Sequence, residues 1–504
     1  MRTTGCRSAP RRGWPPRCSR TSPPAVLPLT SGSRKRSTAM PDAHRRSSLR
    51  RWWAAVAESL DSRLWPVPVA VVVVAVALGI AIPRIDILLD SRLPNEVDSA
   101  VFNGGADTAR SVLSSIAGSL ITATSLTFSL TVVALQLASS QASPRVLRLF
   151  ARDRQVHWTL AAFLGTFAYS IAVLRAVRSA TESDPEFVPR IAVTVSFLLT
   201  LVSVVMLVFF LAHLAAQLRV ETMLKDIHAD TDRTIDLVDA RDSGATAFSG
   251  AVETPRRRRA VAAGTSGFVT GRDLALLTDV AVDRGIVVAE AKAVGDNVVA
   301  GMPLAFWWTD GRNETGAEAD AEATADALRR AFTIEYERNA VEDVGYGVQQ
   351  IVDIALRALS PGVNDPVTAV HALGHLTAVT ARRIDMARPP AAVSGPDGSL
   401  RVLTLPRTPK QDVDAALTPL RHYGAGDPLL VPRFLQSCLE LSTLCSEPSV
   451  HAALLAQLAA LERQLRASTA DPAQVTELLT LSAQTRRQMQ EATSAVDGGH
   501  DGSC

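Results

Sequence analysis

Long runs without a charged residue dominate the chain between residues 64 and 218, whereas the sequence that follows mixes polar and apolar positions. A helix needs about 20 mostly apolar residues to cross the hydrocarbon core of a bilayer. The segments that meet this requirement cover residues 64–83, 111–138, 156–175 and 191–213. The pattern therefore predicts an α-helical polytopic membrane domain with four transmembrane helices, over residues 51–218.

The second of these segments is unusually long and polar. No charged residue falls between Ser111 and Pro144, so a continuous helix there must tilt, project beyond the bilayer or break. Small polar residues recur along it at steps of three, four or seven, which places them on one helix face. We call this set the polar stripe: Ser115, Gly118, Ser119, Thr122, Ser125, Ser129 and Gln136.

Two interpretations of the polar stripe stay open. Small residues allow helices to pack closely, and their hydroxyl groups can bond back to carbonyls one turn earlier. Alternatively, the stripe lines a hydrated path through the membrane. Because it carries no charge, the stripe predicts neither a proton relay nor an ion pair within the bilayer.

Arginines between the predicted spans indicate the orientation, because cytoplasmic loops are enriched in Lys and Arg. The flank before the first span and the loop between spans two and three are the most basic, whereas the other two loops are richer in acid. We therefore expect a bacterial inner-membrane protein with both termini in the cytoplasm. Within the basic loop, Arg145, Arg148 and Arg152 either grip lipid phosphates or simply mark the inner side.

The first 50 residues hold twelve Lys and Arg against one acid, Asp42, and show no apolar periodicity. Such composition predicts a disordered basic arm. It either touches an anionic leaflet or is an extension upstream of a native start at Met40. The remaining 454 residues carry 40 basic and 49 acidic residues, which gives no general attraction for nucleic acid.

After residue 218 the pattern predicts a mainly helical, α+β cytoplasmic region. A strand, helix, strand, turn and strand pattern suggests one small β-rich module, and helical periodicity dominates beyond it. The predicted parts are an amphipathic connector (219–263), the β-rich module (264–308), an acidic linker (309–330), a helical domain (331–493) and a disordered tail (494–504).

The β-rich module carries no sign of a cofactor. Residues 295–304 look like one half of a biotinyl or lipoyl carrier barrel, but the turn at 295–297 lacks the lysine to which such carriers attach their cofactor. A role in packing or oligomer contacts is the simpler interpretation, and we predict no cofactor.

Candidate chemistry in the helical domain is sparse. Asp365 precedes Pro366 and fits an N-cap followed by proline at the first helical position. Alternatively, Asn364 and Asp365 form a ligand loop. His371 and His375 have the i, i+4 spacing of a metal-binding pair, but no third ligand accompanies them, so no metal site is predicted. No acid, base and nucleophile stand together, and we predict no catalytic residues and no enzymatic activity.

Two longer motifs resemble a known family. The first runs from Leu-Ser-Ser-Ile-Ala-Gly to Gln-Ala-Ser-Pro-Arg over residues 113–145, and the second is Ile-Ala-Leu-Arg-Ala-Leu-Ser-Pro-Gly-Val-Asn-Asp-Pro-Val-Thr-Ala at 354–369. In this order they are similar to the bacterial membrane proteins grouped as domain of unknown function 2254, over roughly residues 60–480. The resemblance implies a multi-pass membrane protein and no particular activity.

These observations support two hypotheses of function. In the first, the chain is a homo-oligomeric pore or transport-like protein in the lipid bilayer, with a cytoplasmic gating or vestibule domain. In the second, it is a membrane-tethered cytoplasmic binding or sensory module, in which the region after the last span does the work.

Overall fold

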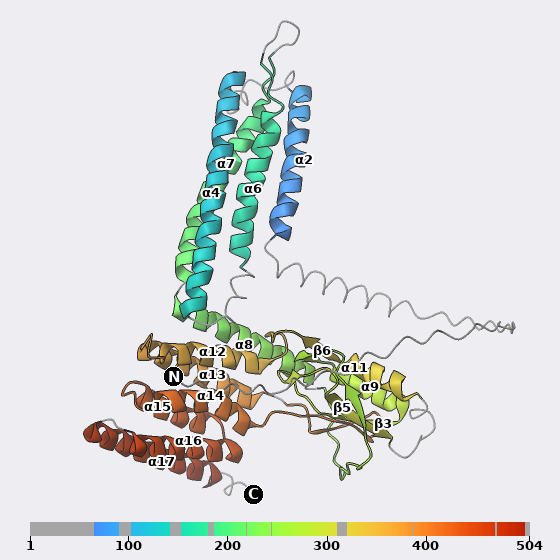
Figure 1. The fold of residues 1–504 in the computed structure, drawn as a ribbon, viewed down its shortest axis with the longest axis vertical. Coiled ribbons are helices and arrows are strands. Elements are labelled where there is room, and N and C mark those ends of the chain that lie inside the picture. The colour runs from blue at the N-terminus through green and yellow to red at the C-terminus, as the bar shows by residue number, and fades with distance from the viewer. Residues whose placement is uncertain are drawn as a thin grey trace, which may run out of the picture. The chain divides into compact units, whose positions relative to one another are not determined.

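The computed structural model describes residues 65–89, 102–141, 153–179, 186–217, 219–242, 244–309, 320–386, 388–468 and 471–498. Figure 1 draws the ribbon. The predicted basic arm, Met40 and the loop arginines Arg145, Arg148 and Arg152 lie outside the described residues.

Among the described residues, four helices are long and apolar enough to cross a membrane. They are α2 (Pro66–Leu89), α4 (Ala106–Gln141), α6 (Arg154–Leu174) and α7 (Arg190–Gln217). All four lie on the predicted segments, so the prediction of a four-helix membrane domain is confirmed. Helix α4 begins at Ala106, before the predicted span. The prediction began later because Asp107 and Arg110, in the first turns of the helix, precede the uncharged run.

Helix α6 is the centre of this bundle. In its most apolar part 61% of the residues are buried, against 17–22% in the other three helices. Glycines bring α2 close to α6: a Cβ atom on Gly165 would lie 2.7 Å from Val71 Cγ1, and one on Gly79 would lie 2.6 Å from Ala172 Cβ. This contact is the close small-residue packing typical of membrane helices.

Hydroxyl groups join α6 to α7. Ser170 Oγ lies 2.7 Å from Ser196 Oγ, and Thr166 Oγ1 lies 3.2 Å from Ser203 Oγ. The Tyr169 hydroxyl also donates to the Ala192 carbonyl at 3.1 Å. All of these contacts are buried, so interhelical hydrogen bonds stabilise this helix pair.

The C-terminal region contains two sheets and a set of packed helices (Figure 1). The five-stranded sheet has the order β1-β5-β3-β8-β7, and a three-stranded sheet has the order β4-β2-β6. The strands are β1 (Arg259–Ala262), β2 (Gly267–Arg272), β3 (Ile286–Glu290), β4 (Asn297–Val298), β5 (Pro303–Thr309), β6 (Phe332–Glu335), β7 (Ala392–Ser394) and β8 (Leu400–Leu403). Within the sheets, the β3–β8 pair is parallel and the others are antiparallel.

The sheets extend beyond the segment 264–308 in which the pattern placed the β-rich module. Strand β1 begins earlier, and β6, β7 and β8 come from residues after 330. Val288 of β3 pairs with Val402 of β8, more than a hundred residues away. The sequence pattern also predicts a short strand at 400–405, where β8 lies, so it missed β1, β6 and β7 but not β8. Local periodicity carries no information about which distant strands pair.

The segment 309–330, which composition predicted to be a linker, contains α11 (Ala321–Arg329). Its Ala325, Ala327 and Leu328 are buried, and Leu328 belongs to the core that the sheets share with α9 (Leu274–Arg284). Asp273 caps the start of α9, and Gly285 ends it with φ at 61°. Enough apolar side chains therefore remain in this acidic segment to fix a helix.

The remaining helices form a second core. They are α8 (Val220–Asp242), α12 (Val344–Ala358), α13 (Pro366–Asp385), α14 (Pro409–Gly424), α15 (Leu430–Leu444), α16 (Pro448–Ala467) and α17 (Pro472–Gly498). Helix α8 buries Met223, Leu224 and Ile227 in this core beside α12 and α13. A membrane domain followed by a mainly helical region with some sheet is thus the confirmed fold class.

Candidate functional site

The polar stripe lies on the outer surface of the four-helix bundle. All seven of its residues are exposed within the chain. The opposite side of α4, which packs on the other helices, carries buried Ala109, Leu113 and Leu120. Exposed Leu126 and Phe128 flank the stripe. Helix α4 therefore turns its most polar strip away from its own bundle.

Helices α2 and α7 behave in the opposite way. Their exposed faces are apolar, as Val73, Val208 and Phe209 illustrate with exposed fractions of 63%, 64% and 63%. These are the surfaces expected to face lipid chains. The polar stripe differs from them in kind, because small hydroxyl-bearing residues are typical of helix contacts in membranes.

The hydroxyls of the stripe bond partly within α4 itself. Ser119 donates to the Ser115 carbonyl at 2.7 Å and Thr122 donates to the Gly118 carbonyl at 2.9 Å. At Gly118 a Cβ atom would meet no other atom within 4 Å, so the surface there is open. Within the part of the chain that the structure describes, the stripe accordingly takes no part in close packing.

The segment proposed as a ligand loop forms a helix cap. Asp365 accepts from the Thr368 backbone N–H at 3.1 Å and from its hydroxyl at 2.6 Å. These hydrogen bonds hold the pKa of the Asp365 carboxyl below its usual value. Asn364 is exposed and adopts a left-handed φ of 50°. The observed geometry serves to start α13, and a ligand role for the two residues stays a prediction.

The i, i+4 spacing of His371 and His375 on α13 suggested that they act as a pair, but His375 contacts a histidine on another helix. His375 Nδ1 lies 2.7 Å from Nδ1 of His228 on α8, and His228 Nε2 lies 3.5 Å from Asp232. Burial lowers the pKa of His375, and the neighbouring His228 and His371 lower it further. In the part of the chain that the structure describes, no group of three or more ligand side chains is placed to hold a metal ion.

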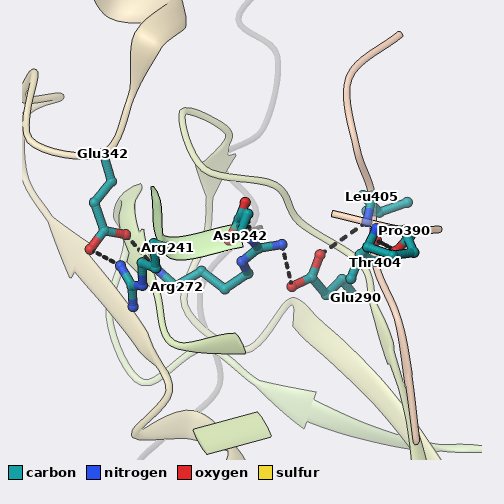
Figure 2. Close-up of polar contacts among 8 residues, drawn as sticks. All are labelled: Arg241, Asp242, Arg272, Glu290, Glu342, Pro390, Thr404 and Leu405. Carbon is teal, nitrogen blue, oxygen red and sulfur yellow. Dashed lines mark hydrogen bonds and ion pairs between the residues drawn. The ribbon is translucent and has the colours of Figure 1, made fainter. Parts of the chain in front are cut away.

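A charged cluster, which sequence patterns did not single out, lies where β2, β3 and the end of α8 meet. Figure 2 shows Arg272 extended between Asp242 and Glu290. One terminal nitrogen of Arg272 donates to both Asp242 oxygens at 3.0 Å, and the other lies 3.5 Å from Glu290 Oε1. The second Glu290 oxygen accepts from the Leu405 backbone N–H at 3.0 Å.

Glu342 also belongs to this cluster. Its carboxylate accepts from the Arg241 side chain and, at 2.9 Å, from the Arg272 backbone N–H (Figure 2). Glu290 is deeply buried, and burial raises the pKa of its carboxyl against the opposing effect of Arg272. Buried charges of this kind persist only where they are paired and hydrogen-bonded, as these are.

A second group of charges surrounds Asp412 in the first turn of α14. Arg383 Nε lies 2.8 Å from Asp412 Oδ1, although not in hydrogen-bond alignment, and Arg388 donates to Oδ2 at 3.1 Å. Arg407 Nε lies 3.5 Å from Oδ1. Asp412 and Arg383 are only 3% and 7% exposed. Three guanidinium groups therefore share one buried carboxylate.

Both groups line a single cavity of about 120 Å³. Its wall includes Arg272 and Glu290 from the sheets, Gly345 from α12, Arg383 from α13 and Asp412 from α14. We call it the arginine cavity. Contributing residues are spread from position 238 to position 412, so no local motif pointed to it. The sequence offered one indication of this cavity: arginines and acidic residues occur next to apolar segments that form strands and helices.

A four-helix membrane domain joined to a mainly helical region with two small sheets defines the class of this protein. The family described as "Predicted membrane protein (DUF2254)" matches residues 61–440, and the chain belongs to this family. The resemblance of the two sequence motifs is thereby confirmed.

Relatives in mycobacteria share most of the chain. The uncharacterized protein Mb1321c of Mycobacterium bovis is 31% identical over 421 residues, which is 83% of this chain and 79% of the relative. The uncharacterized protein Rv1290c of Mycobacterium tuberculosis matches with the same identity and coverage. No solved structure matches the chain. The comparisons support a membrane protein and assign no activity.

Proposed function

We propose that the protein is a homo-oligomeric, pore-like or transport-like protein of the bacterial inner membrane, in which α4 of each copy faces a shared axis. The observation that carries this proposal is the exposure of the whole polar stripe on a bundle whose other outer faces are apolar. The positive-inside pattern supports cytoplasmic termini and a cytoplasmic C-terminal region that gates or surrounds the path.

In a monomer the polar stripe would face lipid chains. Lipid chains offer no hydrogen-bond partners, so a polar strip gains nothing from contact with them. Contact with α4 of another copy would bury small residues closely, and water along the axis would solvate the hydroxyls that point there. Either arrangement brings stripe residues of neighbouring copies together, whereas the apolar faces of α2 and α7 stay in lipid.

Cysteine cross-linking tests this arrangement. In a background with Cys6, Cys18 and Cys504 replaced by serine, we would introduce Thr122→Cys or Ser129→Cys and oxidise the protein in membranes. We expect disulfide-linked dimers from these stripe variants. Val205→Cys and Val208→Cys on the exposed face of α7 are the matched controls, for which we expect monomers. Equal cross-linking from α7, or none from the stripe, would contradict the proposed contact.

Solute movement requires a separate measurement. Purified protein in liposomes should release trapped potassium or a small dye, and Thr122→Leu combined with Ser125→Leu should reduce that release by removing the hydroxyls. The same pair of leucines should leave the amount of folded protein unchanged, because both positions are open in the chain. Oligomers that pass no ion or dye under voltage would leave the contact standing and refute the pore.

The arginine cavity favours a second candidate function, a membrane-tethered cytoplasmic binding or sensory module. Small-molecule sites are concave and place a few convergent polar or charged side chains that orient the ligand. A thermal-shift screen of the full chain in detergent tests this role. Compounds that stabilise the wild type through the cavity would support it, and binding should persist when the polar stripe is replaced by leucines.

A further inference from the structure

We propose that the arginine cavity binds a small ligand through an oxyanion group, a phosphate or a carboxylate, held by Arg383 and Arg407 and by the charge of Arg388. The terminal nitrogens of Arg388 already donate to the Ile384 and Arg383 carbonyls and to Asp412. This inference deepens the second candidate function, on which it rests, and does not depend on the polar stripe. The ligand chemistry follows from the charges, the space and the placement of these three side chains.

The charges around Asp412 are not balanced. Around Asp412 three arginines meet one carboxylate, which leaves an excess of two positive charges in contact with a buried group. Asp343 is the next acid in reach, but it is engaged by Arg338 Nε at 2.7 Å and caps α12 through the Tyr346 N–H at 3.1 Å. A bound oxyanion would offset the excess.

Asp412 engages the guanidinium groups of Arg383 and Arg407 only loosely. Arg383 approaches Asp412 through Nε and without hydrogen-bond alignment, so its two terminal nitrogens are not used in that contact. Arg407 stands 3.5 Å from the same oxygen, at the long end of an ion pair. Guanidinium groups present paired donors that match the oxygens of phosphate and carboxylate, which is why arginine predominates where such groups are recognised.

The cavity leaves space beside Arg383. Gly345 lies at the cavity wall, where a Cβ atom would be 3.5 Å from Arg383 Nη1 and 3.2 Å from Asp343 Oδ1. A larger residue at this position would take up the volume next to the guanidinium. The cavity of about 120 Å³ has room for several waters or for one phosphate or short carboxylic acid. It is well below the roughly 300–1,000 Å³ of sites for drug-sized molecules.

The opposite end of the cavity carries an excess of negative charge. There Arg272 faces both Asp242 and Glu290, so acid exceeds base by one. A ligand with its oxyanion at the Asp412 end can place a hydroxyl or an ammonium group at the Glu290 end. This polarity fixes one direction of binding and disfavours a molecule that carries anionic groups at both ends.

The test uses the full chain in detergent, as wild type and as single variants at Arg388, Arg407 and Gly345, with a control variant at Arg486 and one double variant. Inorganic phosphate is titrated while the thermal transition and the heat of binding are recorded, with potassium chloride at equal ionic strength as the salt control. We expect a saturable rise in Tm with phosphate. Arg388→Gln and Arg407→Gln should each weaken the affinity for phosphate roughly tenfold or more, since the first removes a positive charge and the second a charged hydrogen-bond donor.

Gly345→Ala provides a variant that leaves every charge in place. Its added methyl group enters the cavity, whereas alanine is a better helix former than glycine, so binding should fall without loss of folded protein. Arg486→Gln is the matched control, because Arg486 pairs with Glu462 on α16 and does not line the cavity. We expect the control to bind phosphate as the wild type does.

Two sources of the oxyanion are distinguished by a second arm. Vesicles containing phosphatidic acid are compared with vesicles of phosphatidylcholine alone, and glycerol phosphate is tested in free solution. Binding of the free phosphate compounds points to a soluble ligand, and binding only to phosphatidic acid vesicles points to a lipid headgroup. Either result must be abolished by Arg388→Gln with Arg407→Gln to support the proposal.

The proposal is overturned if phosphate, carboxylates and acidic vesicles all leave the wild type unchanged relative to chloride, or if the double variant responds as the wild type does. Stabilisation by uncharged or cationic compounds through the cavity would overturn the oxyanion class but leave the binding role standing. Failure of every compound to stabilise the protein would refute both.

Discussion

Replacing Asp412 with asparagine removes the one carboxylate that three arginines share. Asp412 is 3% exposed and lies within 3.5 Å of guanidinium nitrogens from Arg383, Arg388 and Arg407. The change keeps the shape of the side chain and deletes its charge, so three positive groups are left together, of which Arg383 is buried and Arg407 is 42% exposed. Removing one partner of a buried ion pair costs about 3–5 kcal/mol of folding free energy.

The expected shift in Tm follows from the size of the C-terminal region. For domains of 150–250 residues a change of 1 kcal/mol moves Tm by roughly 2–4 °C. The region after residue 218 is somewhat larger, so we take the lower slope and expect Asp412→Asn to lower Tm by roughly 6–10 °C. Differential scanning calorimetry of the full chain in detergent measures this shift.

A matched surface pair gives the control. Glu440 receives two hydrogen bonds at 3.0 Å from Arg433, and both side chains are partly exposed to solvent. Exposed ion pairs contribute about 0–1 kcal/mol, so Glu440→Gln should lower Tm by no more than roughly 2 °C. Phosphate should stabilise Asp412→Asn more than it stabilises the wild type, because the uncompensated charge is larger. Equal Tm values for the two variants would refute the reasoning.

Three further predictions follow from single contacts. Gly165→Leu should sharply reduce the yield of folded protein from membranes, because even a Cβ atom there would lie 2.7 Å from Val71. Gly118→Leu should fold normally, because that position is open, and should weaken cross-linking between copies along α4. Size-exclusion chromatography in detergent separates these outcomes, and normal folding of Gly165→Leu would contradict the packing of α2 on α6. The pKa of His375 is lowered in the folded state, mainly by burial, so its stabilising contribution is present above the ordinary value of 6.5 and is lost as pH falls below it. Tm measured from pH 7.5 to 5.5 should therefore fall more in the wild type than in His375→Gln, and parallel curves would exclude this histidine. Asp365→Ala should lower the free energy of unfolding by about 1 kcal/mol, because α13 loses its N-cap. Urea unfolding of the full chain measures this change, and a decrease under a few tenths of a kcal/mol would show that the Asp365 cap does not stabilise α13.

The sequence by itself determined the features that depend on local length and periodicity. Four apolar runs predicted α2, α4, α6 and α7, because the thickness of a bilayer sets the length that a spanning helix requires. The cap at Asp365 followed from three adjacent residues, and the structure shows its hydrogen bonds to Thr368. The family could likewise be identified from two motifs, and the match over residues 61–440 confirms it.

Only the tertiary structure decided which distant segments meet. Strand β8 joins β3, His375 meets His228 and Arg383 meets Asp412 and Arg407, because packing of α8, α12, α13 and α14 brings these positions together. Periodicity placed the polar stripe on one face of α4 but did not determine whether other helices of the same chain cover that face. The position of α6 in the bundle decided it, since α4 buries its apolar side there and leaves Thr122 and Ser125 exposed.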